Sequence, residues 1–273
     1  MSKCVKIIVL SLAILLLVVP ASVLAVSSVK FYEEGGHVFD DWDVCRTNAV
    51  GEDGFFQISS TGFYPIIVGE SLGENADKAY RLGQQFAEDY PDIHQRAEKI
   101  FVFARDRVRY TSDESQFNFG EFALNADELA VTIGDKGVAY GDCEDYAVLL
   151  AVMYRGAGFR SAIVLAPDHA AALVYLPDYG KANRSLTVGD EPGWVWAEAT
   201  GGNNDLGWMP ERFMGAQLGV YEVEDKAITK IEPPDKASIV VNPEGGSRGI
   251  HISPFFIVIV LMWLLPLFRR RRR

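Results

Sequence analysis

The stretch from Gly141 to Gly158 constrains the fold more than any other part of the chain, because a glycine turn leads through a cysteine into an apolar helix pattern. Four residues recur at helical spacing on one face: Tyr146, Leu149, Leu150 and Met153. Gly156 and Gly158 stand where a helix is expected to end. Cys143 is therefore expected at a helix N-terminus, where exposed backbone N–H groups lower the pKa of a thiol.

Three acidic residues flank this cysteine: Asp142, Glu144 and Asp145. The helix dipole favours them in a first turn, but their charge opposes a thiolate, so a partner base is needed. Carboxylates are also the hard oxygen ligands that calcium prefers. We expect no cofactor; a calcium site stays open beside the simpler alternative, a solvated acidic helix start.

The bulk composition indicates one globular body with appendages. The chain has 273 residues, 49% of them hydrophobic, which is enough for one good core. Its formal net charge is −11, but without Lys3, Lys6 and the five terminal arginines, 19 Lys+Arg remain against 37 Asp+Glu, so the body is near −18. This acidic balance argues against nucleic-acid binding, which needs a basic footprint.

Both ends of the chain carry apolar segments. Residues 1–25 combine lysines, an apolar run and a small-residue site, as in a secretory signal peptide; an uncleaved signal anchor is the alternative. Residues 250–268 are long enough to span a bilayer, and the arginines 269–273 would stay in the cytoplasm. We therefore expect a single-pass protein of the cell membrane with an extracytoplasmic body. A sorting signal that is cut and replaced by another anchor has the same pattern.

Composition and the positions of glycine and proline divide the rest of the chain into three parts. These are an N-terminal extension of short strands and loops (26–70), a main domain (71–225) and a proline- and glycine-rich spacer (226–249).

Within the main domain the periodicity changes from helical to extended. Helices are expected at residues 76–90 and 91–108, and a capped turn at Asn125. Strands are expected at residues 161–166, 170–176 and 194–199. The polar loop 177–193 contains the glycosylation sequon Asn183-Arg184-Ser185.

Cysteine catalysis needs a thiol, a base that takes its proton and a third group that orients the base. The sequence supplies these in chain order: Cys143 at a helix start, His169 at a strand start and Glu198 at a strand end. Gaps of 26 and 29 residues allow adjacent elements of one α+β unit to bring them together. Taken singly, each residue also has an ordinary explanation: a buried apolar cysteine, a surface histidine or a solvated carboxylate.

Three segments resemble the transglutaminase-like superfamily: Gly141-Asp142-Cys143-Glu144-Asp145-Tyr146-Ala147, Asp168-His169-Ala170 and Trp194-Val195-Trp196-Ala197-Glu198-Ala199-Thr200. The first is similar to the Cys segment of the bacterial transglutaminase-like cysteine proteinases, and the likeness covers roughly residues 101–212. The resemblance implies an α+β fold with a papain-like core, helices packed on a small antiparallel sheet, and a Cys-His-Asp triad at these positions.

The third position departs from the family pattern, which usually reads Asp-Pro-Thr where this chain has Glu198-Ala199-Thr200. Glutamate is one methylene longer but can still accept from the imidazole N–H and fix its tautomer. Asp168 and Asp205 are reserve candidates. Since the family often adds an upstream oxyanion donor, Tyr110 is a candidate for that role, with a surface-packed tyrosine as the alternative.

The resemblance implies acyl transfer. The predicted function is a membrane-tethered extracytoplasmic cysteine hydrolase, a peptidase, amidase or isopeptidase, acting on a protein or peptide outside the cell. Two alternatives remain: a protein cross-linking acyltransferase, and a non-catalytic binding or envelope-scaffold module. Cys45 adds a structural alternative, since a Cys45–Cys143 disulfide would remove the nucleophile.

Overall fold

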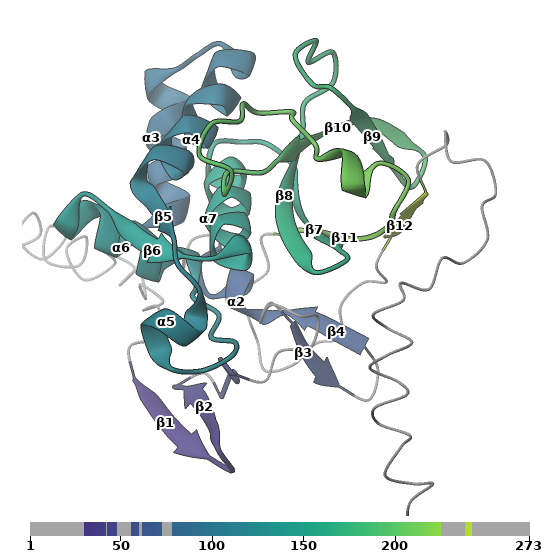
Figure 1. Ribbon diagram of the computed structural model, residues 1–273. Coiled ribbons are helices and arrows are strands. Elements are labelled where there is room, and N and C mark those ends of the chain that lie inside the picture. The colour runs from purple at the N-terminus through teal and green to yellow at the C-terminus, as the bar shows by residue number, and fades with distance from the viewer. Residues whose placement is uncertain are drawn as a thin grey trace, which may run out of the picture.

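The computed structural model describes residues 30–41, 43–47, 56–59, 62–72, 78–224 and 238–241 (Figure 1). The expected signal peptide (1–25) and membrane span (250–268) lie outside these residues. Among the residues described, no helix combines the length and apolar character needed to cross a bilayer.

The fold is α+β, with helices on one side and an antiparallel sheet on the other (Figure 1). The helices are α2 (Ile66–Gly69), α3 (Ala79–Asp89), α4 (Ile93–Arg107), α5 (Asp113–Phe117), α6 (Ala126–Lys136), α7 (Cys143–Gly156) and a short 3-10 helix, η2 (Glu211–Phe213). The prediction of helices packed on an antiparallel sheet is confirmed.

The main sheet has six strands in the order β12-β11-β7-β8-β10-β9. They are β7 (Ser161–Ala166), β8 (His169–Tyr175), β9 (Ser185–Val188), β10 (Glu191–Ala197), β11 (Gln217–Glu222) and β12 (Ser238–Val241). Every pairing is antiparallel. The two edge strands β12 and β9 also approach each other, so the sheet curls strongly. Strand β12 lies inside the segment expected to be a spacer, so the sheet extends beyond residue 225.

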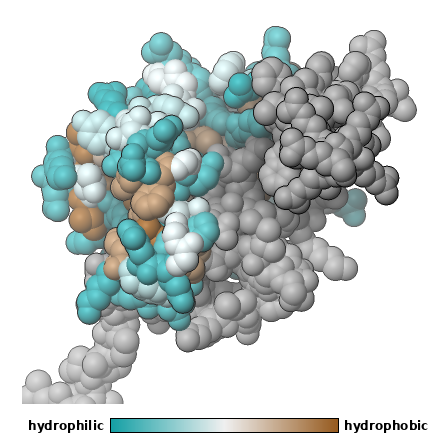
Figure 2. Space-filling model, turned by 60° about the horizontal axis from the view of Figure 1, so that its bottom comes forward, coloured by the Kyte–Doolittle hydropathy of each residue, from teal (hydrophilic) through white to brown (hydrophobic). Residues whose placement is uncertain are grey.

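Three small ribbons complete the structure: β1 (Phe31–Glu34) with β2 (His37–Asp40), β3 (Phe56–Ser59) with β4 (Gly62–Pro65), and the parallel pair β5 (Val108–Tyr110) and β6 (Ala139–Gly141). The first two form the short strands expected in the N-terminal extension. The lower end of the molecule, which carries β1 and β2, comes forward in Figure 2, where apolar patches are enclosed by hydrophilic surface. Exposed aromatic side chains on β1 are Phe31 and Tyr32.

Helix α7 is the centre of the main core. Its residues are buried from Cys143 to Tyr154, and it packs against α3, α4, α6 and the strands β7 and β8 (Figure 1). Glycine permits the closest approach to α3: a Cβ on Gly156 would lie 2.0 Å from the Tyr80 carbonyl oxygen, and one on Gly83 would lie 2.0 Å from the Met153 carbonyl oxygen. Gly156 thus ends the helix, as its position predicts, and also lets α3 and α7 pack closely.

Both faces of the sheet are buried, because alternate residues of β8 serve two cores. Ala170, Ala172 and Val174 face the helical core. Ala171 and Leu173 face a second core inside the curl of the sheet, with Trp194, Trp196 and Phe213. The alternation explains why β8 reads as a continuous apolar run.

Helix boundaries follow their capping residues. The side chain of Asp92 accepts a hydrogen bond from Gln95 N at 2.8 Å, so α4 begins at Ile93 rather than at Pro91. At Asn125, a capping box with Glu128 starts a full helix that continues to Lys136, where the sequence suggested only a capped turn.

Arg46 joins the N-terminal extension to the main domain. Its guanidinium is fully buried and forms ion pairs with Asp40 at 2.9 Å, Glu70 at 3.0 Å and Glu128 at 2.9 Å. It also donates to the Ala123 carbonyl oxygen at 2.9 Å. These contacts connect β2, the segment after α2 and the start of α6 through a single side chain.

Candidate active site

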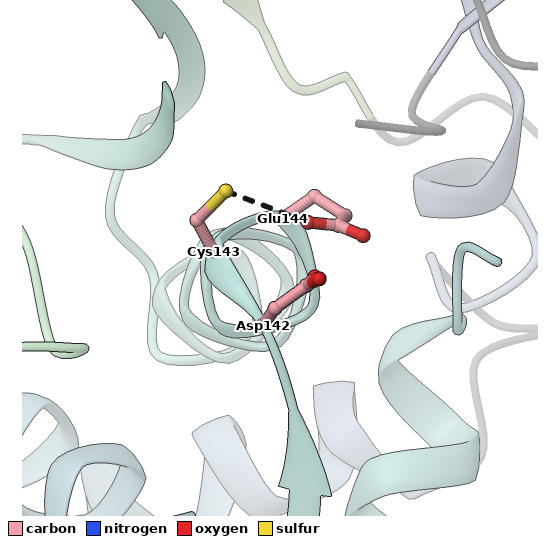
Figure 3. Close-up of side chains that lie close together, drawn as sticks. All are labelled: Asp142, Cys143 and Glu144. Carbon is pink, nitrogen blue, oxygen red and sulfur yellow. Dashed lines mark hydrogen bonds between the residues drawn. The ribbon is translucent and has the colours of Figure 1, made fainter. Parts of the chain in front are cut away.

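Cys143 is the first residue of α7, as the sequence predicts, and its exposure is 8%. The turn before it is fixed by Asp145, whose carboxylate accepts a hydrogen bond from Asp142 N at 3.2 Å. A Cβ on Gly141 would lie 2.6 Å from that carboxylate, so the position requires glycine. The thiol donates to the Glu144 carboxylate at 3.5 Å, and Figure 3 shows it pointing toward Glu144 at the helix end.

The acidic neighbours oppose a thiolate less than their number suggests. Burial raises the pKa of Glu144 well above its ordinary value, and the nearby Asp145 and Asp142 raise it further. Burial likewise raises the pKa of Asp145, with Asp142 adding to the effect. A carboxyl with a raised pKa carries less negative charge, so Glu144 and Asp145 oppose a thiolate at the helix N-terminus less than two ordinary carboxylates would.

His169 is placed by the tight turn between β7 and β8. Ala166 pairs with His169, so only Pro167 and Asp168 form the connection, and Asp168 adopts the left-handed backbone conformation with φ of 55°. The imidazole Nε2 is hydrogen-bonded to the Glu198 carboxylate, and both side chains are buried. A carboxylate that accepts this hydrogen bond fixes the imidazole proton on Nε2 and leaves Nδ1 as the acceptor nitrogen.

Glu198 directly follows β10 and is itself held in place. One carboxylate oxygen contacts His169, while the other accepts hydrogen bonds from the backbone N of Thr200, at 3.1 Å, and from its hydroxyl. The Asn204 side chain donates to the Glu198 carbonyl oxygen. The longer glutamate therefore reaches the position where the resemblance expects an aspartate.

An aromatic stack fixes the plane of the imidazole ring. Phe213 of η2 lies parallel to His169, with centroids 5.2 Å apart and 7° between the planes. Trp196 of β10 packs against Phe213 at 5.6 Å. Phe213 and Trp196 belong to the second core, so the base stands on a rigid support. The sequence contained Thr200 within a recognised motif but gave no signal for Phe213.

Tyr146 links the two halves of the site electrostatically. It lies on α7, three residues after Cys143, and its hydroxyl donates to the Val108 carbonyl oxygen at 2.6 Å. Burial raises the pKa of its phenol to about 12, Arg109 lowers it and Glu198 raises it. Since α7 packs against β8, the first turn of α7 and the His169–Glu198 pair belong to one region of the domain.

The other sequence candidates lie at the margin of this region. Tyr110 is 58% exposed on β5 and pairs with Gly141, directly before the turn that leads to Cys143. Asp168 occupies the hairpin turn, and Asp205 faces solvent 3.6 Å from Arg105. Glu198 is the carboxylate that contacts His169, so neither reserve aspartate takes that position.

The carboxylates near Cys143 form a candidate cation site with a fourth residue that sequence spacing could not reveal. Ligand oxygens of Asp113, Asp142, Glu144 and Asp145 all lie within 4.8 Å of one another. Asp113 comes from α5, 31 residues before Glu144, and joins the cluster only through the fold. The buried Glu144 Oε1 has no hydrogen-bond partner among the described residues. An unsatisfied carboxylate oxygen within an acidic cluster fits a hard cation such as calcium.

Two other sequence features are resolved by their contacts. Cys45 and Cys143 are both buried and are not joined by a disulfide, so the structural alternative is not realised. The side-chain amide of the sequon residue Asn183 donates to the Met209 carbonyl oxygen at 2.9 Å and accepts from Met209 N at 3.0 Å. This amide therefore holds two loops together.

The arrangement defines an α+β domain in which a cysteine at a helix start lies in the same region as a histidine–carboxylate pair on an antiparallel sheet. Residues 80–211 match the transglutaminase-like superfamily, and this part of the chain is a transglutaminase-like domain. The superfamily includes cysteine hydrolases and acyltransferases. A comparison with curated proteins gave no match.

Proposed function

We propose that the protein is a cysteine hydrolase that cleaves amide or isopeptide bonds through Cys143, His169 and Glu198. The hydrogen bond between His169 and the buried Glu198 carries this proposal, because it orients the imidazole on the strand beside the helix that begins with Cys143. Likeness of the Cys segment to bacterial transglutaminase-like cysteine proteinases supports the same chemistry.

The reaction follows from the assigned groups. His169 Nδ1 takes the proton of Cys143, and the thiolate attacks the substrate carbonyl carbon to form a tetrahedral oxyanion. The backbone N–H of Cys143 and the Tyr110 hydroxyl are the candidate donors to that oxyanion. When the C–N bond breaks, the imidazolium protonates the leaving amine. Water then gives its proton to His169, attacks the thioester and regenerates the thiol with release of the acid.

The carboxylates around Cys143 also suggest that the hydrolase depends on a bound cation. Asp142, Glu144 and Asp145, together with Asp113, would hold a divalent cation such as calcium. A bound cation would neutralise their negative charge beside the thiol. The chain's own residues would still perform the proton transfers.

The location belongs to the proposal as well. An apolar segment at each end of the chain supports export of the acidic body and anchoring through residues 250–268. The substrate would then be a protein or peptide outside the cell. Protease protection of the full-length protein in sealed membrane vesicles tests this topology.

Thiol alkylation of the full-length protein tests the chemistry. Iodoacetamide should modify Cys143, identified by peptide mass, faster than it modifies a free model thiol at the same pH. His169→Gln should slow the reaction strongly, whereas His94→Gln, at a half-buried histidine that packs on Tyr179, should leave it unchanged. A slow Cys143 that does not respond to His169→Gln would favour the non-catalytic scaffold.

A second assay distinguishes water from an amine as the acceptor of the acyl group. With a peptide library, hydrolysis gives new amino termini, and cross-linking gives incorporation of monodansylcadaverine; both should disappear in Cys143→Ala. Amine incorporation without new termini would replace hydrolase by acyltransferase.

A further inference from the structure

Two arginines beside the candidate active site differ from the others in the described chain. Arg46, Arg105 and Arg160 each form an ion pair with a carboxylate. Arg109 and Arg212 are exposed and have neither an ion pair nor a hydrogen bond with any residue that the structure describes. In a body with an excess of carboxylates, two guanidinium groups without an ion pair to any described residue are notable, because nearby acids usually neutralise them.

Arg109 lies on the β5–β6 ribbon that leads to the nucleophile. It pairs with Tyr140, and its neighbour Tyr110 pairs with Gly141, two residues before Cys143. Its charge acts on the Tyr146 phenol, as does that of Glu198. Arg109 therefore stands within electrostatic range of the first turn of α7.

Arg212 lies in η2, next to the phenylalanine that stacks on His169. Its guanidinium carbon is 4.5 Å from the centroid of the Phe213 ring, which stacks on His169. The contact with Phe213 restricts the arginine without neutralising it. The adjacent Glu211 is exposed and forms no ion pair with Arg212 in the described structure.

We propose that Arg109 and Arg212 bind a carboxylate of the substrate next to the scissile amide, so that the preferred substrate is an acidic peptide. This inference rests on the proposed hydrolase chemistry and deepens it. Guanidinium groups recognise carboxylates by paired, charge-assisted hydrogen bonds. They also offset the repulsion that an acidic peptide meets from the net negative body. The carboxylate is an aspartate or glutamate side chain, or a free peptide C-terminus.

Three alkylating reagents test the inference on the full-length protein: N-bromoacetyl-glutamic acid α-amide, the neutral N-bromoacetyl-glutamine α-amide, and N-bromoacetyl-glutamine with a free α-carboxylate. For each of the two negatively charged reagents, the rate of Cys143 alkylation, measured by peptide mass, is divided by the rate with the neutral reagent. This ratio should fall by up to about fivefold in Arg109→Gln and in Arg212→Gln, the size of one Coulomb contact in water. The Lys99→Gln control removes the same charge from an exposed position on α4 and should keep the wild-type ratio.

The reagents separate the possible failures. A larger effect on the glutamic acid reagent identifies a side-chain carboxylate, and a larger effect on the free α-carboxylate identifies a peptide C-terminus. An unchanged rate with the neutral reagent shows that the variants remain folded. Equal ratios in wild type and both variants would overturn the inference while leaving the hydrolase intact. A Cys143 inert to all three reagents would remove the proposed function and the inference with it.

Discussion

Replacing Arg46 by methionine should destabilise the protein strongly, because it removes the only described guanidinium that contacts Asp40, Glu70 and Glu128 together. Asp40 and Glu70 are fully buried in this ion-pair cluster. Breaking a buried ion pair by removing one partner costs about 3–5 kcal/mol, since a charge is left uncompensated. Methionine preserves much of the side-chain volume, so the cavity contribution stays small.

Arg160→Met is the matched control. Arg160 also binds two carboxylates, Glu191 and Glu222, but its side chain is 40% exposed. Solvent screens such pairs, and their loss costs about 0–1 kcal/mol. Urea denaturation of both variants should therefore give clearly different free energies of unfolding.

The cost of Arg46→Met should also depend on pH. Burial raises the pKa of Glu70 to about 9, Asp40 adds to the rise and Arg46 lowers it. Between its ordinary value of 4.5 and about 9, the folded protein holds a proton that the unfolded chain has lost, so Glu70 makes stability fall as pH rises. Without Arg46 this pKa rises further, so wild type and variant differ only where the wild-type Glu70 ionises, and the variant should lose more stability at about pH 10 than at about pH 7. Equal losses at both pH values, or a loss no larger than that of Arg160→Met, would refute the reasoning.

Four further predictions concern the site and the core. Glu198→Gln should lower the rate of Cys143 alkylation or turnover by about 10²–10⁴-fold. Glu198→Asp should lower it by up to about 100-fold, because the shorter side chain reaches His169 less well. Equal rates in the wild type and both variants would contradict the orienting role of Glu198. Phe213→Leu should cost about 0.5–1.5 kcal/mol of stability from the lost ring stack and slow Cys143 alkylation, whereas a stability loss with normal alkylation would leave Phe213 a core residue only. Gly156→Ala should lower the free energy of unfolding by about 1–3 kcal/mol, since its Cβ would meet the Tyr80 backbone. Gly134→Ala, at an open helical position, should raise that free energy by up to about 1 kcal/mol. Thermal denaturation of the two variants checks both values. Calcium should raise the melting temperature of the wild type saturably, by several degrees at about 100 times the Kd. The shift should vanish when a chelator is added, and it should be absent in Glu144→Gln. A wild type whose melting temperature does not change with calcium would rule out the cation site.

Local patterns were enough to predict the elements that carry the candidate triad. The helix that starts at Cys143 and the β7–β8 hairpin are confirmed, because each depends on short-range periodicity and turn residues. The strand expected at residues 194–199 is also present as β10, but it ends at Ala197, so Glu198 follows the strand instead of lying within it. The contact between His169 and Glu198 agrees with the expected pairing. Their catalytic roles remain a prediction.

Long-range partners could not be predicted from such patterns. Arg46 lies far in sequence from Glu128, Asp113 from Glu144, and Phe213 from His169. Each looks like an ordinary surface or core residue by itself. Strand β12 was missed for a related reason: its four residues stand in a segment rich in proline, glycine and charge, and pairing with β11 determines its conformation.

The order of the residues along the chain has a consequence for synthesis. A nascent chain that has emerged through α7 already contains the thiol, but its base depends on residues made later. Glu198 orients the imidazole, and Phe213, fifteen residues further on, supports its ring. Strand β11, which pairs with β7, follows Phe213. Under the proposed mechanism, the enzyme would therefore stay inactive during most of its own translation. During that time, other proteins at the ribosome or translocon would meet a Cys143 thiol whose base is not yet oriented.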